Sequence, residues 1–191
     1  FTISPKGKYV IWYDPKEKNY FTYTVSTGAI TNITRHIKVP LYDEEDDHPD
    51  DPPSHGLMKW KENDEYVYVY DKYDAWQCDP TGAAQPVNIT NGRAQKIRYR
   101  YMQGSRDEKF VATNQKMAFR LLNEVNKTGG IGIYDPVSRS LSKTTGNYSI
   151  GFLFLKAKNA DQFLYTRESF DQSPSIVTCR DSASNLVLGI T

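Results

Sequence analysis

The sequence predicts an all-β fold, a partial β-propeller of about four blades with roughly four antiparallel strands each. Two stretches, residues 3–34 and 58–90, carry variations on one phrase. Each begins with a polar turn, continues into an aromatic and β-branched strand that ends in Asp, and closes on Asn-Ile-Thr. One such repeat cannot bury its own apolar face, so copies must stack. Aromatic residues make up 13% of the chain, which favours sheet over helix.

The first two repeats span residues 1–34 and 58–90, and residues 189–191 end the chain on a related Gly-Ile-Thr. Turn residues such as Asp14-Pro15 and Thr27-Gly28 separate their apolar runs. The predicted strands are residues 8–14, 20–25 and 29–34 in the first repeat, and 65–71, 75–79 and 85–90 in the second. The near-continuous Tyr/Val run at 66–70 indicates a sheet that is covered on both faces.

Two more diverged repeats follow, at residues 96–145 and 151–191. In the third we expect strands at 97–102, 109–113, 117–123, 132–134 and 141–144, with turns at Gly129-Gly130 and Asp135-Pro136. Propensity alone would allow a helix over 114–125, but the repeat context favours a strand. In the fourth we expect strands at 152–156, 162–167, 175–179 and 185–188. Repeats of this length, each with about four strands, are typical of propeller blades. The alternative architecture is an elongated stack of sheets.

Residues 35–57 form a predicted insertion loop, because they combine an acidic tract with four prolines. The tract at 43–51 holds seven acidic residues and no Lys or Arg. It does not match the Asp-x-Asp-x-Asp-Gly pattern of a calcium loop, so we interpret it as solvated charge. Glu44 and Glu45 are the candidate substrate-binding residues, since paired carboxylates can hold the amino group of a peptide.

Composition excludes several classes of protein. Removing the seven acidic residues of the tract from the total of 23 leaves 16 against 24 basic residues, a net charge of +8. That excess is scattered, so nucleic acid is not an expected partner. No apolar run approaches the roughly 18 residues of a membrane span. Phe1 already lies in a strand-like segment, so we expect no signal peptide in this chain and interpret it as part of a longer protein.

The sequence offers no catalytic, metal or cofactor motif. The nearest approach to Gly-x-Ser-x-Gly surrounds Ser149, but Asn147 replaces the first Gly and no helix is predicted to follow. Residues 129–132 lack the spacing and the Lys of a phosphate loop. The three histidines lack metal-site spacing, and Cys78 and Cys179 are expected to be single, at least half-buried thiols. Four Asn-x-Ser/Thr sequons are interpreted as strand-end chemistry rather than glycan sites.

Longer strings carry a family resemblance. Residues 73–82 read YDAWQCDPTG and residues 86–93 read PVNITNGR; together with 4–9, 40–45 and 156–173 they resemble the propeller of bacterial prolyl oligopeptidase/dipeptidyl peptidase IV-type serine peptidases. The resemblance implies an N-terminal propeller that screens peptide substrates for a C-terminal hydrolase domain. That domain, with its Ser-Asp-His triad, is absent from these 191 residues. No catalytic residue is therefore carried over.

The resemblance further implies a periplasmic or secreted parent protein, with peptides as substrates. In the dipeptidyl peptidase branch, acidic propeller residues bind the free amine of the peptide, which is the role we expect of Glu44 and Glu45. The alternative function is a stand-alone propeller that binds protein or glycan ligands. In either case, four blades without ring closure leave sheet edges open, and we expect self-association through them.

Overall fold

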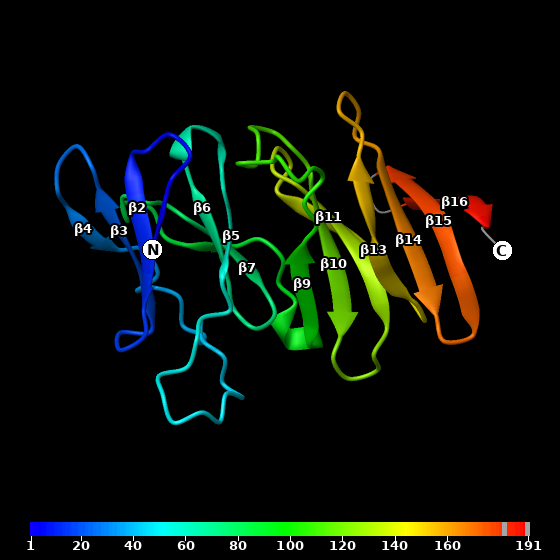
Figure 1. The fold of residues 1–191 in the computed structure, drawn as a ribbon, viewed down its shortest axis with the longest axis horizontal. Helices are drawn as coiled ribbons and strands as arrows, with labels where there is room; N and C mark the ends of the chain where they lie inside the picture. Colours follow the sequence, from blue (N-terminus) through cyan, green and yellow to red (C-terminus); the bar gives the residue numbers. More distant parts are fainter. Residues whose placement is uncertain (181–182, 190–191) are drawn as a thin grey trace. The chain divides into compact units, whose positions relative to one another are not determined.

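A computed structural model describes residues 1–180 and 183–189, and in these residues the fold is all-β, as predicted. Four four-stranded antiparallel sheets are present, and every strand pairs with its neighbour in sequence. The colours of Figure 1 therefore run through each sheet in turn. The strands are β1 Thr2–Ile3, β2 Tyr9–Asp14, β3 Asn19–Thr24, β4 Ile30–Asn32, β5 Leu57–Trp60, β6 Val67–Tyr70, β7 Ala75–Cys78, β8 Val87–Asn88, β9 Ile97–Tyr101, β10 Met117–Asn123, β11 Gly129–Asp135, β12 Ser140–Gly146, β13 Ser149–Lys156, β14 Phe163–Ser169, β15 Gln172–Arg180 and β16 Ala183–Gly189.

The chain divides into two compact units. Unit 1 comprises Phe1–Asn91 and Lys109–Thr113, with sheets β1–β4 and β5–β8 and the short 3-10 helix η1 (Glu62–Asp64). Its core includes Ile11 and Tyr20 from the first sheet and Val67 and Cys78 from the second. These side chains meet because alternate residues of a strand point to the same face, so each sheet buries one apolar face against the other.

Unit 2 comprises Gly92–Glu108 and Asn114–Thr191, with sheets β9–β12 and β13–β16 and the 3-10 helix η2 (Arg93–Gln95). Its core joins Ala118, Ile131 and Ile133 of the first sheet to Phe163 and Val177 of the second. In the register of β10 and β11, Ala118 lies opposite Ile133 and Arg120 opposite Ile131. One face of this sheet therefore carries both core side chains and an arginine.

The acidic or amide residue near the end of several strands closes a turn. Its side-chain oxygen accepts hydrogen bonds, at 2.6 to 3.4 Å, from the backbone N–H groups two and three residues later. This arrangement occurs at Asp14, Asp71, Asn123 and Asp135. Asp and Asn are favoured in such turns because their short side chains reach their own backbone. The Asp that ends the repeated strand is thus a turn residue.

The repeated Asn-Ile-Thr phrase is a strand-locking motif. The Asn oxygen accepts the Thr N–H, and the Ile is buried. The Thr hydroxyl accepts the backbone N–H of a residue in the preceding strand. It also donates to the side chain of the residue just before that one. The bonds are Tyr20 N to Thr34 (2.9 Å), Thr34 to Asn19 (2.8 Å), Ala75 N to Thr90 (3.0 Å) and Thr90 to Asp74 (2.7 Å). The asparagines of both phrases therefore have the strand-end role that the sequence predicted.

Replacing Thr90 with Val should lower the free energy of unfolding by about 1–3 kcal/mol, because the buried Ala75 N–H loses its acceptor. Valine keeps the side-chain shape, so the loss is specific to the hydroxyl. Denaturant unfolding followed by tryptophan fluorescence measures it. Thr2→Val, at an exposed position, is the matched control and should stay within about 0.5 kcal/mol of the parent. Equal losses in the two variants would contradict this role of the motif.

Contacts outside the core also join the sheets of unit 1. The buried Thr22 hydroxyl donates to the Pro80 carbonyl at 2.6 Å. Gly82 follows in a turn with φ of +69°, and a Cβ placed there would lie 2.5 Å from Thr31 Cγ2. Two features therefore require glycine at position 82: the positive φ of the backbone and the close approach of the neighbouring sheet.

Some predicted elements are wrong. Residues 109–113 are not a strand of the third repeat; Val111 forms an isolated parallel bridge with Lys61, and the segment belongs to unit 1. Gly129 and Gly130 are not a turn but the start of β11. Strand β5 was not predicted. The strand preferred over a helix at 114–125 is confirmed as β10. Of the final Gly-Ile-Thr, residues 190–191 lie outside the described residues.

Candidate functional site

The predicted substrate-binding residues, Glu44 and Glu45, lie in the loop between β4 and β5 and are exposed. Glu45 forms an ion pair with Lys72 at 2.6 Å, from the tight turn between β6 and β7. The base of the loop is ordered by sheet-like pairing of Tyr42 with Ser54 and by the buried Leu41. Figure 1 shows this loop in cyan, extending away from the strands of unit 1. Glu44 and Glu45 are thus exposed residues on a loop with an anchored base.

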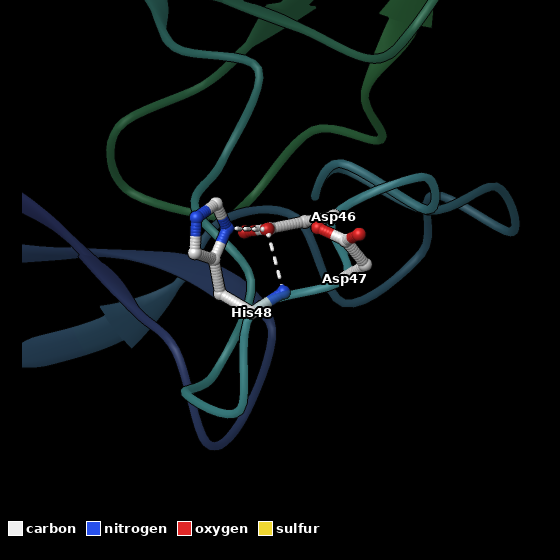
Figure 2. A group of neighbouring side chains, drawn as sticks. All are labelled: Asp46, Asp47 and His48. Atoms are coloured by element: carbon white, nitrogen blue, oxygen red, sulfur yellow. Dashed lines mark hydrogen bonds and ion pairs between the residues drawn. The ribbon is translucent and has the colours of Figure 1, made fainter.

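Three side chains at the tip of the loop lie together (Figure 2). Each of Asp46, Asp47 and His48 offers one atom that could bind a metal ion, and these atoms are all within 4.8 Å of one another. The spacing of the histidines in the sequence did not predict this group. His48 Nδ1 is paired with the Asp46 carboxylate, and the His48 N–H also donates to it. Asp47 and His48 are exposed. Exposed carboxylates often cluster by chance, so we interpret this group as a local ion pair.

Titration of His48 tests this ion pair. Its side-chain hydrogen bond with Asp46 raises the pKa of His48 and lowers the pKa of Asp46. The contact should be strongest between about pH 4 and pH 6.5, where both groups are charged. It is lost as the pH rises through the raised pKa of His48 and as it falls through the lowered pKa of Asp46. NMR titration should show a lower His48 pKa in Asp46→Asn and no change in Asp47→Asn. Equal pKa values in all three proteins would disprove the pairing.

A second candidate site is a cationic pocket in unit 2, which we call the arginine pocket. It has a volume of about 690 Å³ and is lined by four arginines, Arg98, Arg100, Arg106 and Arg120. Leu122 of β10 and Phe154 of β13 supply an apolar wall. This volume is in the range of small-ligand sites in proteins.

Strand register produces the arginine pocket. Arg100 of β9 and Arg120 of β10 are directly opposed Cα partners, and Arg98 lies two residues from Arg100. The three arginines therefore share one face of the sheet. Ala118 lies on this face too, two residues from Arg120 and in the core of unit 2. The apolar interface of unit 2 thus passes into a cationic edge on β9 and β10.

Two of the four arginines have no carboxylate partner in the described part of the chain. Arg98 is paired with Glu124 at the long distance of 3.8 Å. Within the described part of the chain, neither Arg106 nor Arg120 has a carboxylate within 4 Å. Two of the arginines also donate to backbone carbonyls, Arg120 to Gly151 at 3.3 Å and Arg100 to Tyr99 at 2.8 Å. The arginine pocket therefore keeps a positive charge that suits an anion.

The arginine pocket was not predicted from the sequence, because its four arginines do not form a run of basic residues. The available signal was the alternation in Ile97–Tyr101, which reads IRYRY. A period of two places both arginines on the same face of a strand. The third arginine, Arg120, reaches that face through pairing of β9 with β10.

The string that carries the family resemblance has structural roles. Asp71 and Asp74 are both buried next to the turn between β6 and β7. Asp71 accepts the indole N–H of Trp76 at 2.8 Å, and Asp74 accepts the hydroxyl of Thr90 at 2.7 Å. The Tyr-Asp-Ala-Trp and Asn-Ile-Thr strings are thus parts of one hairpin and its lock, so they report on fold rather than on chemistry.

The reactive side chains singled out in the sequence lie in strands. Ser149 begins β13, in keeping with the interpretation that it is not a nucleophile on a strand-to-helix turn. Both cysteines are free and buried, as expected. Burial raises the pKa of the Cys78 thiol, which disfavours the reactive thiolate. Among the described residues, no helix is long and apolar enough to cross a membrane.

No protein-family model and no curated protein matches this chain.

Proposed function

We propose that this chain is a non-catalytic segment of a β-propeller that binds peptides and controls their access to a serine peptidase domain of the same protein. One observation carries the proposal: four four-stranded meanders follow one another, and two of them close on the same strand-locking phrase. A succession of such sheets is the building plan of a propeller. The resemblance to prolyl oligopeptidase-type peptidases supplies the function, and with it a periplasmic or secreted location.

In this proposal Glu44 and Glu45 hold the free amine of a peptide. Their exposure on an anchored loop is compatible with such a role. The ion pair with Lys72 would have to exchange for the amine of the ligand, which an exposed ion pair permits because it contributes little free energy.

The coding sequence downstream of codon 191 tests the proposal. We expect it to encode Gly-x-Ser-x-Gly in a hydrolase domain, and we expect the whole protein to cleave chromogenic dipeptide or acyl-aminoacyl substrates. The 191-residue chain should not cleave them. A stop codon soon after position 191 would overturn the proposal.

The second candidate function is a stand-alone binding module, favoured by the arginine pocket, which this chain forms from its own residues. A pull-down or glycan array with the 191-residue chain tests it. Tight and specific capture of a protein or glycan would favour this function. Failure to bind, together with peptidase activity in the whole protein, would exclude it.

We also expect the chain to self-associate, because four blades without ring closure leave sheet edges open. The terminal strands β4 and β8 carry the exposed side chains Ile30 (65%) and Val87 (52%). Unpaired apolar edge strands are templates for pairing with another chain. Sedimentation of the 191-residue chain should therefore show dimers or larger species whose fraction grows with concentration, and Ile30→Lys should reduce that fraction. A strict monomer at high concentration would contradict the expectation.

A further inference from the structure

We infer that the arginine pocket of unit 2 binds a peptide through two of its carboxylates, with an apolar side chain of that peptide seated against Phe154. The inference names the substrate class for the proposed peptide-binding role and rests on it. Binding to this chain can nevertheless be measured without a hydrolase domain.

Arg100 and Arg120 form a cross-strand pair of like charges. Like charges that face each other directly across two strands destabilise a sheet. Arg98 adds a third positive charge on the same face, and Glu124 lies 3.8 Å from it. Opposed like charges destabilise the fold, so their presence is expected at a functional site, where they bind a ligand of opposite charge.

The donor groups of these arginines suit carboxylates. A guanidinium group has five N–H donors in a planar fork that matches a carboxylate in a bidentate manner. Arg120 uses one of these donors on the Gly151 carbonyl, at 3.3 Å. Arg106 enters the pocket from the segment that follows β9 and is exposed. Arginines on two strands and one loop therefore suit more than one carboxylate at a time.

The size and lining of the pocket favour a peptide over a bare anion. A volume of about 690 Å³ is far larger than one phosphate or one carboxylate needs. Leu122 and Phe154 make part of the wall apolar, and Phe154 is held by stacking on Phe163, with ring centroids 5.8 Å apart. A ligand that joins acidic groups to an apolar side chain fills both parts of the pocket, and an acidic peptide has this composition.

Calorimetry with the 191-residue chain tests the inference. The probe is acetyl-Glu-Phe-Glu, and its matched control is acetyl-Gln-Phe-Gln amide, which has no carboxylate. We expect the acidic peptide to bind at low salt, at least about tenfold more tightly than its control, and to weaken as salt screens the charges. Equal binding of both peptides, or no binding of the acidic one, would overturn the inference. If inorganic phosphate competes as well as the peptide, the pocket is a general anion site and the peptide assignment fails.

Charge reversal at Arg120 separates binding from folding. Arg120→Glu places a carboxylate opposite Arg100, so the thermal midpoint should stay the same or rise, whereas peptide affinity should fall at least about tenfold. Arg180→Gln, at an exposed position on β15 of the same unit, removes one positive charge outside the pocket and should leave affinity within about twofold. Equal losses of affinity in the two variants would mean that only the net charge of the chain matters. That result would contradict a specific site at the arginine pocket.

The peptide-binding measurement and the downstream coding sequence test the two proposals independently. A hydrolase domain encoded downstream, with no acidic peptide bound, would refute the inference alone. Acidic peptide bound by a chain whose gene stops near codon 191 would refute the peptidase role alone, and would assign the pocket to a binding module.

Discussion

Asp64→Asn is expected to lower the free energy of unfolding by about 2 kcal/mol, although it changes a single atom. The Asp64 side chain is buried and links the two sheets of unit 1. Its carboxylate accepts the Ser4 hydroxyl at 2.6 Å and the backbone N–H groups of Lys6 at 3.1 Å and Lys8 at 3.3 Å. An asparagine presents N–H groups where a second acceptor is needed, so a buried donor is left unpaired. Asparagine tolerates the positive φ of 58° at this position, so backbone strain does not contribute.

Urea unfolding of the variant measures this loss. Asp50→Asn, in the exposed part of the loop, makes the same chemical change and should stay within about 0.5 kcal/mol of the parent. Ser4→Ala should cost about 1 kcal/mol, and the double variant should cost less than the sum because the two residues share a bond. Additive losses would show that Asp64 and Ser4 act independently and would refute the link between the sheets.

Phe163→Ala should be the most damaging substitution in unit 2, with a loss of about 3–5 kcal/mol. Phe163 is 1% exposed and lies in the core between the two sheets of that unit. Its removal leaves a cavity beside Phe154, and it also removes the ring on which Phe154 stacks. The arginine pocket should therefore lose peptide affinity as well, since its apolar wall is no longer held in place.

The chain contains its own control for this substitution. Phe170 lies in the turn between β14 and β15 and is fully exposed, so Phe170→Ala should change the free energy of unfolding by less than about 0.5 kcal/mol. Thermal unfolding by circular dichroism distinguishes the two. A small effect of Phe163→Ala would mean that the two sheets of unit 2 are not held together by this core.

Much of the fold follows from local chemistry that can be read along the chain. The Asp that ends a strand closes its own turn, and the Thr of Asn-Ile-Thr locks the strand before it, over a separation of about fifteen residues. Because these bonds form within one hairpin or sheet, a repeated phrase predicts a repeated sheet. The strand at β10 was identified against its helical propensity for this reason.

Pairings between distant segments were not readable in this way. Residues 109–113 have an apolar, strand-like pattern, yet Val111 bonds with Trp60 and Glu62 of unit 1, about fifty residues earlier. Gly129 and Gly130 have the composition of a turn, but they lie in β11 with strands on both sides. In both cases tertiary packing overrides a local preference.

The sequence by itself determined that the chain is all-β, where most strands and turns lie, and that the two Asn-Ile-Thr phrases close their repeats. Each of these features depends on the alternation of side chains and on hydrogen bonds between near neighbours. It also placed Glu44 and Glu45 in an acidic loop. Only the tertiary structure decided that Asp64 joins two sheets and that Arg98, Arg100 and Arg120 share one face at the edge of a core. The physical reason is register: which residues oppose each other across two strands depends on pairing, and pairing is a property of the folded sheet.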